Sequence, residues 1–182
     1  MKAKDIEDVM QLWLYTNLKA HAFIPEYYWY ENFNEVKSAL SEAEIYVADQ
    51  NKKVIGFIGL IDNYIAGIFV SEHMQLHGIG KQLLSIAKKR HPVLQLHVYK
   101  KNLKAIGFYQ KQDFKIIKSE IDTHTGEEEL FMEWKIGRFE IKSPDGFYDK
   151  NINSQTKKFS KSQVAFLYHF SKNHTHSIFI SI

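Results

Sequence analysis

The sequence predicts an α/β fold, and three patterns favour this class. Apolar residues make up 45% of the 182 positions, which is enough to build a core. Residues 68–84 predict a short apolar strand, a tight loop with two glycines, and an amphipathic helix that ends before Pro92. Residues 94–98 alternate apolar with polar side chains, as expected for a further strand with one buried face. Strands and helices therefore alternate along the chain, as is typical of α/β proteins.

The segments before the loop supply the other elements of the first half. Residues 4–20 keep the apolar spacing of a helix that buries one face. Residues 21–40 are rich in aromatic side chains and predict a packed helical elbow. A polar turn separates residues 45–48 from residues 54–60, so these two runs predict a hairpin. The next turn leads through Tyr64 into the central strand.

The two-glycine loop predicts an anion site. Gly78 and Gly80 expose backbone N–H groups where a helix begins, and the first donors of a helix have no partner within it. These donors and the helix dipole would hold a phosphate without a charged side chain. The loop lacks the Gly-x-x-x-x-Gly-Lys-Ser/Thr pattern and the third glycine of a dinucleotide fingerprint. Nucleotide hydrolysis and hydride transfer therefore lose support.

A second helix and a second hairpin are predicted after residue 100. Residues 102–114 predict a short helix that carries the pair Phe108-Tyr109. Residues 116–117 and 130–134 predict the two strands of the hairpin, around a polar turn.

Over about residues 3–134 the chain resembles the GNAT N-acetyltransferases. The resemblance rests on the Gln-x-x-Gly-x-Gly motif at residues 75–80, followed in order by Asn102 and by Phe108-Tyr109. An early His-x-Phe-Ile segment with a nearby Tyr-Trp makes the chain similar to small bacterial peptidyl-lysine or amine N-acetyltransferases. The resemblance implies an acyl-CoA N-acyltransferase fold, with a mixed, splayed sheet and helices on both faces.

The resemblance also implies how the chain is divided. A GNAT domain is expected over residues 1–136. Residues 137–182 form a basic extension, and the low apolar density of residues 149–162 predicts that it is poorly ordered. The family begins with an edge strand, for which only residues 1–3 remain here, so this strand is expected to be very short or missing. Asp113 stands where the family usually has glycine, and aspartate tolerates the left-handed backbone conformation better than most residues.

The activity that the resemblance implies is transfer of acetyl from acetyl-CoA to a primary amine, by direct attack and without a covalent enzyme intermediate. The acceptor would be a protein lysine, a protein N-terminus or a small amine. The residues expected to bind the cofactor are Ile68, Phe69, Val70, Gln75, Leu76, His77, Gly78, Ile79, Gly80, Lys81 and Asn102. Tyr109 is expected to protonate the departing thiolate. Packing on the sheet is the alternative for Tyr109, and capping of the helix is a second role for Asn102.

For the acceptor site and the base, the sequence offers single candidate residues and no motif. Phe23, Trp29 and Tyr64 are candidates for contact with the acceptor, and core packing is the alternative for each ring. Glu72 and His97 are candidate bases because they lie next to the two central strands, and each is equally explained as a surface or strand-end residue.

A non-catalytic acyl-CoA-binding regulatory protein is the alternative function. A second alternative is a protein that binds nucleic acid through the basic extension, which has 7 basic against 3 acidic residues, whereas residues 1–136 have 17 against 18. Its lysines are scattered, which does not favour nucleic-acid binding. No metal is expected, because no carboxylate or cysteine cluster accompanies the histidines near the end of the chain: His169, His174 and His176.

Location and assembly follow from general features of the chain. It has no cysteine, no apolar run that approaches the ~18 residues of a membrane span, and a start too polar for a signal peptide. We therefore expect a cytoplasmic protein that is not bound to a membrane, as a monomer or a homodimer.

Overall fold

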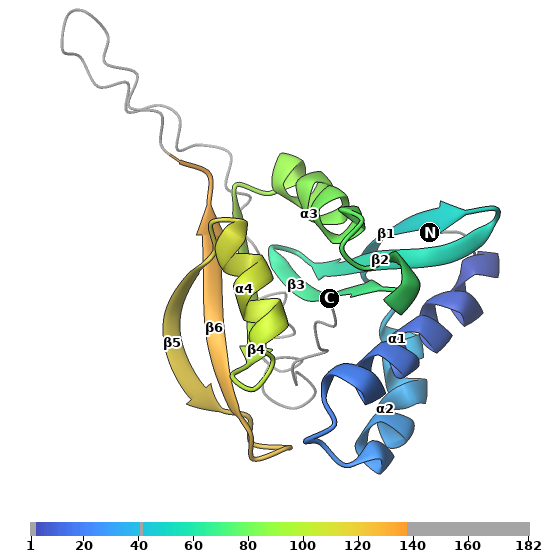
Figure 1. Ribbon diagram of the computed structural model, residues 1–182, viewed down its shortest axis with the longest axis horizontal. Helices are drawn as coiled ribbons and strands as arrows, with labels where there is room; N and C mark the ends of the chain where they lie inside the picture. Colours follow the sequence, from blue (N-terminus) through green and yellow to red (C-terminus); the bar gives the residue numbers. More distant parts are fainter. Residues whose placement is uncertain (1–2, 41, 138–182) are drawn as a thin grey trace, which may run out of the picture. The chain divides into compact units, whose positions relative to one another are not determined.

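The computed structural model describes residues 3–40 and 42–137 (Figure 1). The expectations for residues 138–182, including the poorly ordered extension and the three histidines, lie outside the described residues. The domain boundary at residue 136 stays a prediction.

A mixed six-stranded sheet forms the centre of the fold, in the order β1-β2-β3-β4-β6-β5. Its strands are β1 (Glu44–Gln50), β2 (Lys53–Ile61), β3 (Tyr64–Val70), β4 (Val93–Tyr99), β5 (Lys115–Ile121) and β6 (Glu128–Lys135). The pair β3–β4 is parallel, and the other four neighbouring pairs are antiparallel. Both hairpins that the sequence predicts, β1–β2 and β5–β6, are confirmed.

Helices cover both faces of the sheet (Figure 1). They are α1 (Ile6–Ala20) and α2 (Glu26–Ala39) on one face, and α3 (Ile79–Arg90) and α4 (Leu103–Lys111) on the other. Trp13 and Trp29 are buried with Phe57 in the first layer, and Leu84 and Tyr109 are buried in the second. The predicted α/β class, with a mixed sheet between two helical layers, is confirmed.

The two central strands separate almost as soon as they meet. The register of β3 and β4 contains a single residue pair, Tyr64 with Gln95, supported by a 2.9 Å bond from Gln95 N to Asn63 O. In contrast, β4 and β6 pair over seven residues, from Val93 with Lys135 to Tyr99 with Glu129. The splayed sheet that the resemblance implies is therefore present, and its gap opens toward the ends of β3 and β4.

Local backbone conformations match the sequence where small or polar residues turn the chain. Asn51 and Lys52 have φ values of 52° and 66°, so they form the type I′ turn that suits a two-residue hairpin. Asp113 has a φ of 65°, so aspartate does adopt the left-handed conformation there. Gly56 allows α3 to approach β2, because a Cβ at Gly56 would lie 3.1 Å from Ile79 Cγ2.

The beginning of the chain contributes no strand among the described residues. Ala3–Asp5 forms a short 3₁₀ helix (η1) that runs into α1, and β1 is an edge of the sheet. No helix of the described chain has the length and apolar character needed to cross a membrane.

Candidate active site

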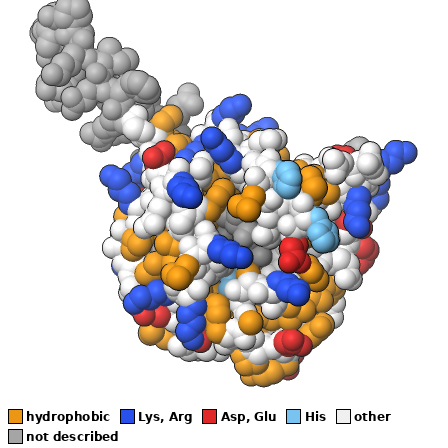
Figure 2. All heavy atoms as spheres, in the orientation of Figure 1, with side chains coloured by type: hydrophobic (Ala, Val, Ile, Leu, Met, Phe, Trp, Pro, Cys, Tyr) orange, Lys and Arg blue, Asp and Glu red, His pale blue; other side chains and the backbone are white. Residues whose placement is uncertain are grey.

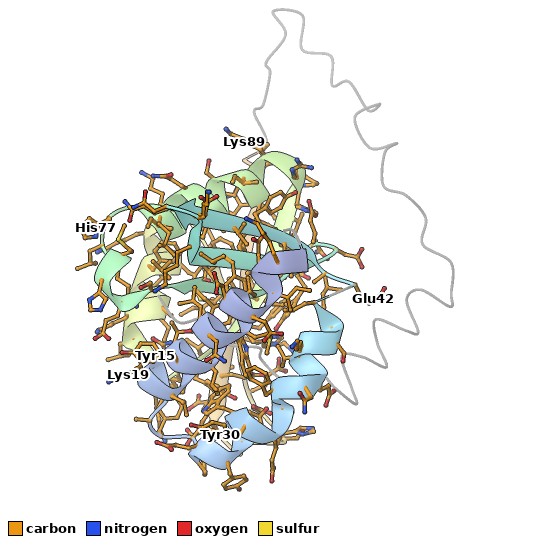
Figure 3. All side chains as sticks on the ribbon, turned by 90° about the vertical axis from the view of Figure 1, so that its right-hand side faces the viewer. Tyr15, Lys19, Tyr30, Glu42, His77 and Lys89 are labelled. Carbon is orange, nitrogen blue, oxygen red and sulfur yellow. The ribbon has the colours of Figure 1, made fainter. Side chains whose placement is uncertain are left out.

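A cleft of about 410 Å³ lies at the open end of the gap between β3 and β4. Its lining comes from the end of α1, from the segment after β3 and from the start of α4, and consists of Tyr15, Thr16, Lys19, Ala20, Glu72, Gln75, Lys101, Asn102, Leu103 and Lys104. Tyr15 and Lys19 point to the same side of the molecule as His77 of the loop (Figure 3). Three lysines against one glutamate make the cleft basic. Figure 2 shows Lys and Arg side chains spread over this face, with an acidic side chain among them near its centre.

The two-glycine loop beside this cleft leaves the N-terminus of α3 uncapped. Gly78 has a φ of 82°, and a Cβ at that position would meet nothing within 4 Å. The first intrahelical bond runs from Gln82 N to Gly78 O at 3.0 Å, so the N–H groups of residues 79–81 have no partner inside the helix. No side chain caps this end, and the first turn carries no acidic residue. The helix start therefore keeps its positive character for an anion.

Side chains of the loop fix its backbone. The Gln75 side chain donates from Nε2 to Val70 O at 3.3 Å, and His77 Nδ1 lies 2.7 Å from Gln75 O. Leu76, with a φ of 62°, is fully exposed. The loop that the sequence predicts to bind phosphate therefore has a defined shape.

One edge of β3 is open. Ile68, Phe69 and Val70 pair with β2 on one side, and within the described chain no strand pairs with them on the side facing β4. Their side chains are buried, and the Phe69 ring stacks on Phe57 with a centroid distance of 4.6 Å. A rigid strand therefore presents unpaired backbone groups to the gap, next to the phosphate loop.

Tyr109 lies under the sheet with a hydroxyl that has no hydrogen-bond partner within the described chain. Its side chain has no exposed surface, and its ring packs against Phe108 and Phe114 at centroid distances of 5.1 and 5.2 Å. Burial, and secondly the charge that Tyr64 would carry, raise the pKa of Tyr109 well above its ordinary value. The hydroxyl therefore holds its proton at neutral pH.

Asn102 performs the capping role that its residue type predicts. Its Oδ1 accepts a 3.1 Å hydrogen bond from Ala105 N at the start of α4. Its Nδ2 lies 3.2 Å from Nε2 of His21, which is buried at the end of α1. The helix cap and His21 together fix the orientation of the Asn102 amide at the edge of the cleft.

Sequence reasoning missed His21 as a partner of Asn102. The His21 ring stacks on Trp29 and meets Tyr99 edge-on, at centroid distances of 5.5 and 5.4 Å. Burial lowers the pKa of His21 to about 3, although a hydrogen bond to the Asn17 backbone opposes this shift. In the neutral imidazole, an unprotonated Nε2 accepts the hydrogen bond that Asn102 Nδ2 donates. The His-x-Phe-Ile segment drew attention to His21 in the sequence. Its contact with Asn102 was not predictable from it, because the two residues are 81 positions apart.

The three acceptor candidates lie in different environments. Trp29 has no exposed surface and belongs to the core beneath α1 and α2, so the structure favours the packing interpretation for this ring. Phe23 is half-buried, with Lys101 Nζ 5.2 Å from its ring centroid. Tyr64 is half-buried at the start of β3, and its hydroxyl lies 3.0 Å from His97 Nδ1.

The two candidate bases lie in separate surroundings. Glu72 is exposed in the cleft and accepts a 2.8 Å hydrogen bond from the Tyr15 hydroxyl. His97 is partly buried on β4 between Tyr64 and Glu120, with its Nε2 2.7 Å from Glu120 Oε1. Sequence reasoning identified neither Tyr15 nor Glu120 as a partner of these residues.

The buried His21 predicts a pH dependence of stability. Its pKa is about 3 in the folded chain, against about 6.5 when unfolded, so below pH 6.5 the unfolded chain binds the extra proton. Stability is full above pH 6.5 and falls as the pH decreases toward 3. At pH 4.5 the loss from this residue is roughly 2–3 kcal/mol. Urea unfolding at pH 7 and pH 4.5 should show a smaller decrease for His21→Gln than for the unsubstituted chain. Equal decreases in the two proteins contradict the assignment.

Comparisons with known proteins agree with this geometry. Residues 41–116 match the family model described as "Acetyltransferase (GNAT) domain". The peptidyl-lysine N-acetyltransferase YiaC of Escherichia coli is 33% identical over 134 residues, which cover 72% of this chain and 92% of YiaC. The peptidyl-lysine N-acetyltransferase YjaB of Escherichia coli is 30% identical over 118 residues, covering 64% of this chain and 80% of YjaB.

The same family is found among solved structures. The solution structure of apo YjaB from Escherichia coli matches with a TM-score of 0.66 and 25% identity, covering 74% of this chain and 93% of YjaB. The match to YiaC covers most of both chains, and the splayed sheet and the two-glycine loop agree with it. The chain belongs to the GNAT family of acetyl-CoA-dependent N-acetyltransferases.

Proposed function

We propose that this GNAT enzyme transfers the acetyl group of acetyl-CoA to the side-chain amine of a lysine in a protein. The open edge of β3, joined through residues 71–78 to the uncapped start of α3, is the observation that carries the proposal. The names of its relatives YiaC and YjaB support the acceptor class, since both are described as peptidyl-lysine N-acetyltransferases.

The cofactor would lie along the gap between β3 and β4. Backbone N–H groups at the start of α3 would hold the pyrophosphate, and the φ of 82° at Gly78 supports a close approach there. The amides of the pantetheine arm would pair with the open edge of residues 68–70, as a neighbouring strand would. Asn102, which lines the cleft at the start of α4, would hydrogen-bond the same arm.

Direct attack is the chemistry that this arrangement supports. A backbone N–H of β3 would polarise the thioester carbonyl as negative charge develops on its oxygen. The amine would attack the carbonyl carbon, and Tyr109 would give its proton to the sulfur as the carbon–sulfur bond breaks. The buried hydroxyl of Tyr109, without a partner in the described chain, supports this role because a thiolate would supply the partner.

Replacing Tyr109 by phenylalanine tests the function and the assigned acid together. The unsubstituted chain should acetylate a lysine-containing peptide, as seen by mass spectrometry, and Tyr109→Phe should lower kcat by roughly 10²-fold or more. The dissociation constant of acetyl-CoA, measured by calorimetry, should stay nearly unchanged, because the ring still packs. Unchanged turnover would remove Tyr109 as the acid. Tight acetyl-CoA binding without turnover of any amine would favour a regulatory binder instead.

The phosphate loop is tested by two matched glycine variants. Gly78 and Gly126 have positive φ values of 82° and 73°, and a Cβ at either position meets nothing within 4 Å. Alanine therefore introduces similar backbone strain at both. Gly78→Ala should weaken acetyl-CoA binding about tenfold or more, because its Cβ would lie where the phosphate approaches, whereas Gly126→Ala should bind like the unsubstituted chain. Equal affinities in the two variants contradict the assigned pyrophosphate site.

A further inference from the structure

Three hydrogen-bonded side chains lie in a row on the α1/α2 face of the sheet. Tyr64 begins β3, His97 lies in β4, and Glu120 lies near the end of β5. The Tyr64 hydroxyl is 3.0 Å from His97 Nδ1, and His97 Nε2 is 2.7 Å from Glu120 Oε1. His97 shares this face with Tyr99, two positions along the strand, which belongs to the core beneath α1 and α2.

Charge fixes the direction of these hydrogen bonds. Partial burial raises the pKa of Glu120, but hydrogen bonds from Lys118 and His97, with their charges, leave it below its ordinary value. An ionised carboxylate only accepts, so Nε2 of a neutral His97 is the nitrogen that carries the proton. The lone pair of Nδ1 then accepts from the Tyr64 hydroxyl. The Tyr64 oxygen keeps its own lone pairs for a further donor.

The row begins at the closed end of the gap between β3 and β4 along which the cofactor would lie. Tyr64 forms the single β3–β4 residue pair, with Gln95, so it marks the point where the two strands separate. Tyr109 belongs to the core cluster on the α3/α4 face, which is the face opposite to the row. The other candidate base, Glu72, is exposed and already accepts a hydrogen bond from Tyr15.

We propose that Tyr64, His97 and Glu120 form the relay that removes the proton from the acceptor amine. Tyr64 is the catalytic group that meets the amine, while His97 and Glu120 are positioning residues that act through it. This inference rests on the proposed acetyl transfer and assigns the base for it. Glu129, whose carboxylate is 4.0 Å from His97 Nε2, adds negative charge that attracts a cationic acceptor.

The proton steps balance over one turnover. The acceptor ammonium gives a proton to the Tyr64 oxygen while Tyr64 gives its own to His97 Nδ1, and Glu120 stabilises the imidazolium that forms. The free amine then bonds to the carbonyl carbon, the carbon–sulfur bond breaks, and Tyr109 protonates the sulfur. The remaining excess proton on the new amide nitrogen passes to Tyr109. His97 releases its proton to solvent, so one proton leaves per acetyl group transferred.

Three variants test the relay on the full chain, with a lysine-containing peptide as acceptor. Tyr64→Phe and His97→Gln should each lower kcat by roughly 10²-fold, and the double variant should be little worse than either, because the residues act as a unit. The dissociation constant of acetyl-CoA should not change in any of them, which shows that the fold and the cofactor site are intact. Full turnover by Tyr64→Phe overturns the relay.

Glu120→Gln distinguishes a positioning role from a merely structural one. The titratable groups that contact His97 are Tyr64 of β3, Glu120 of β5 and Glu129 of β6, and Lys118 of β5 pairs with Glu120. Loss of the Glu120 carboxylate should lower kcat and move the acidic limb of the pH–rate profile to lower pH, because the imidazolium is less favoured. An unchanged profile overturns the positioning role.

A matched control and the unsubstituted chain separate the remaining outcomes. Glu128→Gln removes a carboxylate that pairs with Lys100 on the surface, and should leave both kcat and the pH profile unchanged. A shift as large as that of Glu120→Gln would assign the effect to general surface charge and overturn the inference. If Tyr109→Phe loses activity while the relay variants do not, acetyl transfer stands and only the relay is wrong. No turnover by the unsubstituted chain overturns the proposed function itself.

Discussion

The early separation of β3 from β4 is the constraint on which the site depends. A single residue pair, Tyr64 with Gln95, joins the two strands, so the rest of β3 presents backbone groups that no strand of the described chain satisfies on that side. Unpaired backbone groups on a buried strand are unfavourable, which makes this edge a suitable partner for an extended ligand arm with amides of its own.

Each helical layer then contributes a different part of the proposed chemistry. The α3/α4 layer supplies the uncapped helix start and the buried hydroxyl of Tyr109. The α1/α2 layer carries His21, which is held between aromatic rings and fixes the amide of Asn102. A buried histidine is therefore part of the support for the predicted cofactor site, although it lies in the first helical hairpin and contributes no predicted ligand contact of its own.

Local signals made most of the fold predictable from the sequence. Apolar periodicity identified the strands and helices, the Asn51-Lys52 turn suited a hairpin, and Asp113 was expected to tolerate a left-handed backbone. Contacts between distant residues were not predictable in this way. Nothing near Glu120 in the sequence indicates that it meets His97, because the contact depends on the strand order, which places only β6 between β4 and β5. Burial of Trp29 likewise depends on how the two first helices pack.

The central claim is that the β3 edge and the start of α3 form a cofactor site, and thermal unfolding with and without acetyl-CoA tests it most directly. A ligand at about 1,000 times its dissociation constant adds roughly 4 kcal/mol to the stability of the native state. The account predicts a clear rise in the unfolding midpoint with saturating acetyl-CoA. An unchanged midpoint at the same ligand concentration would contradict the account.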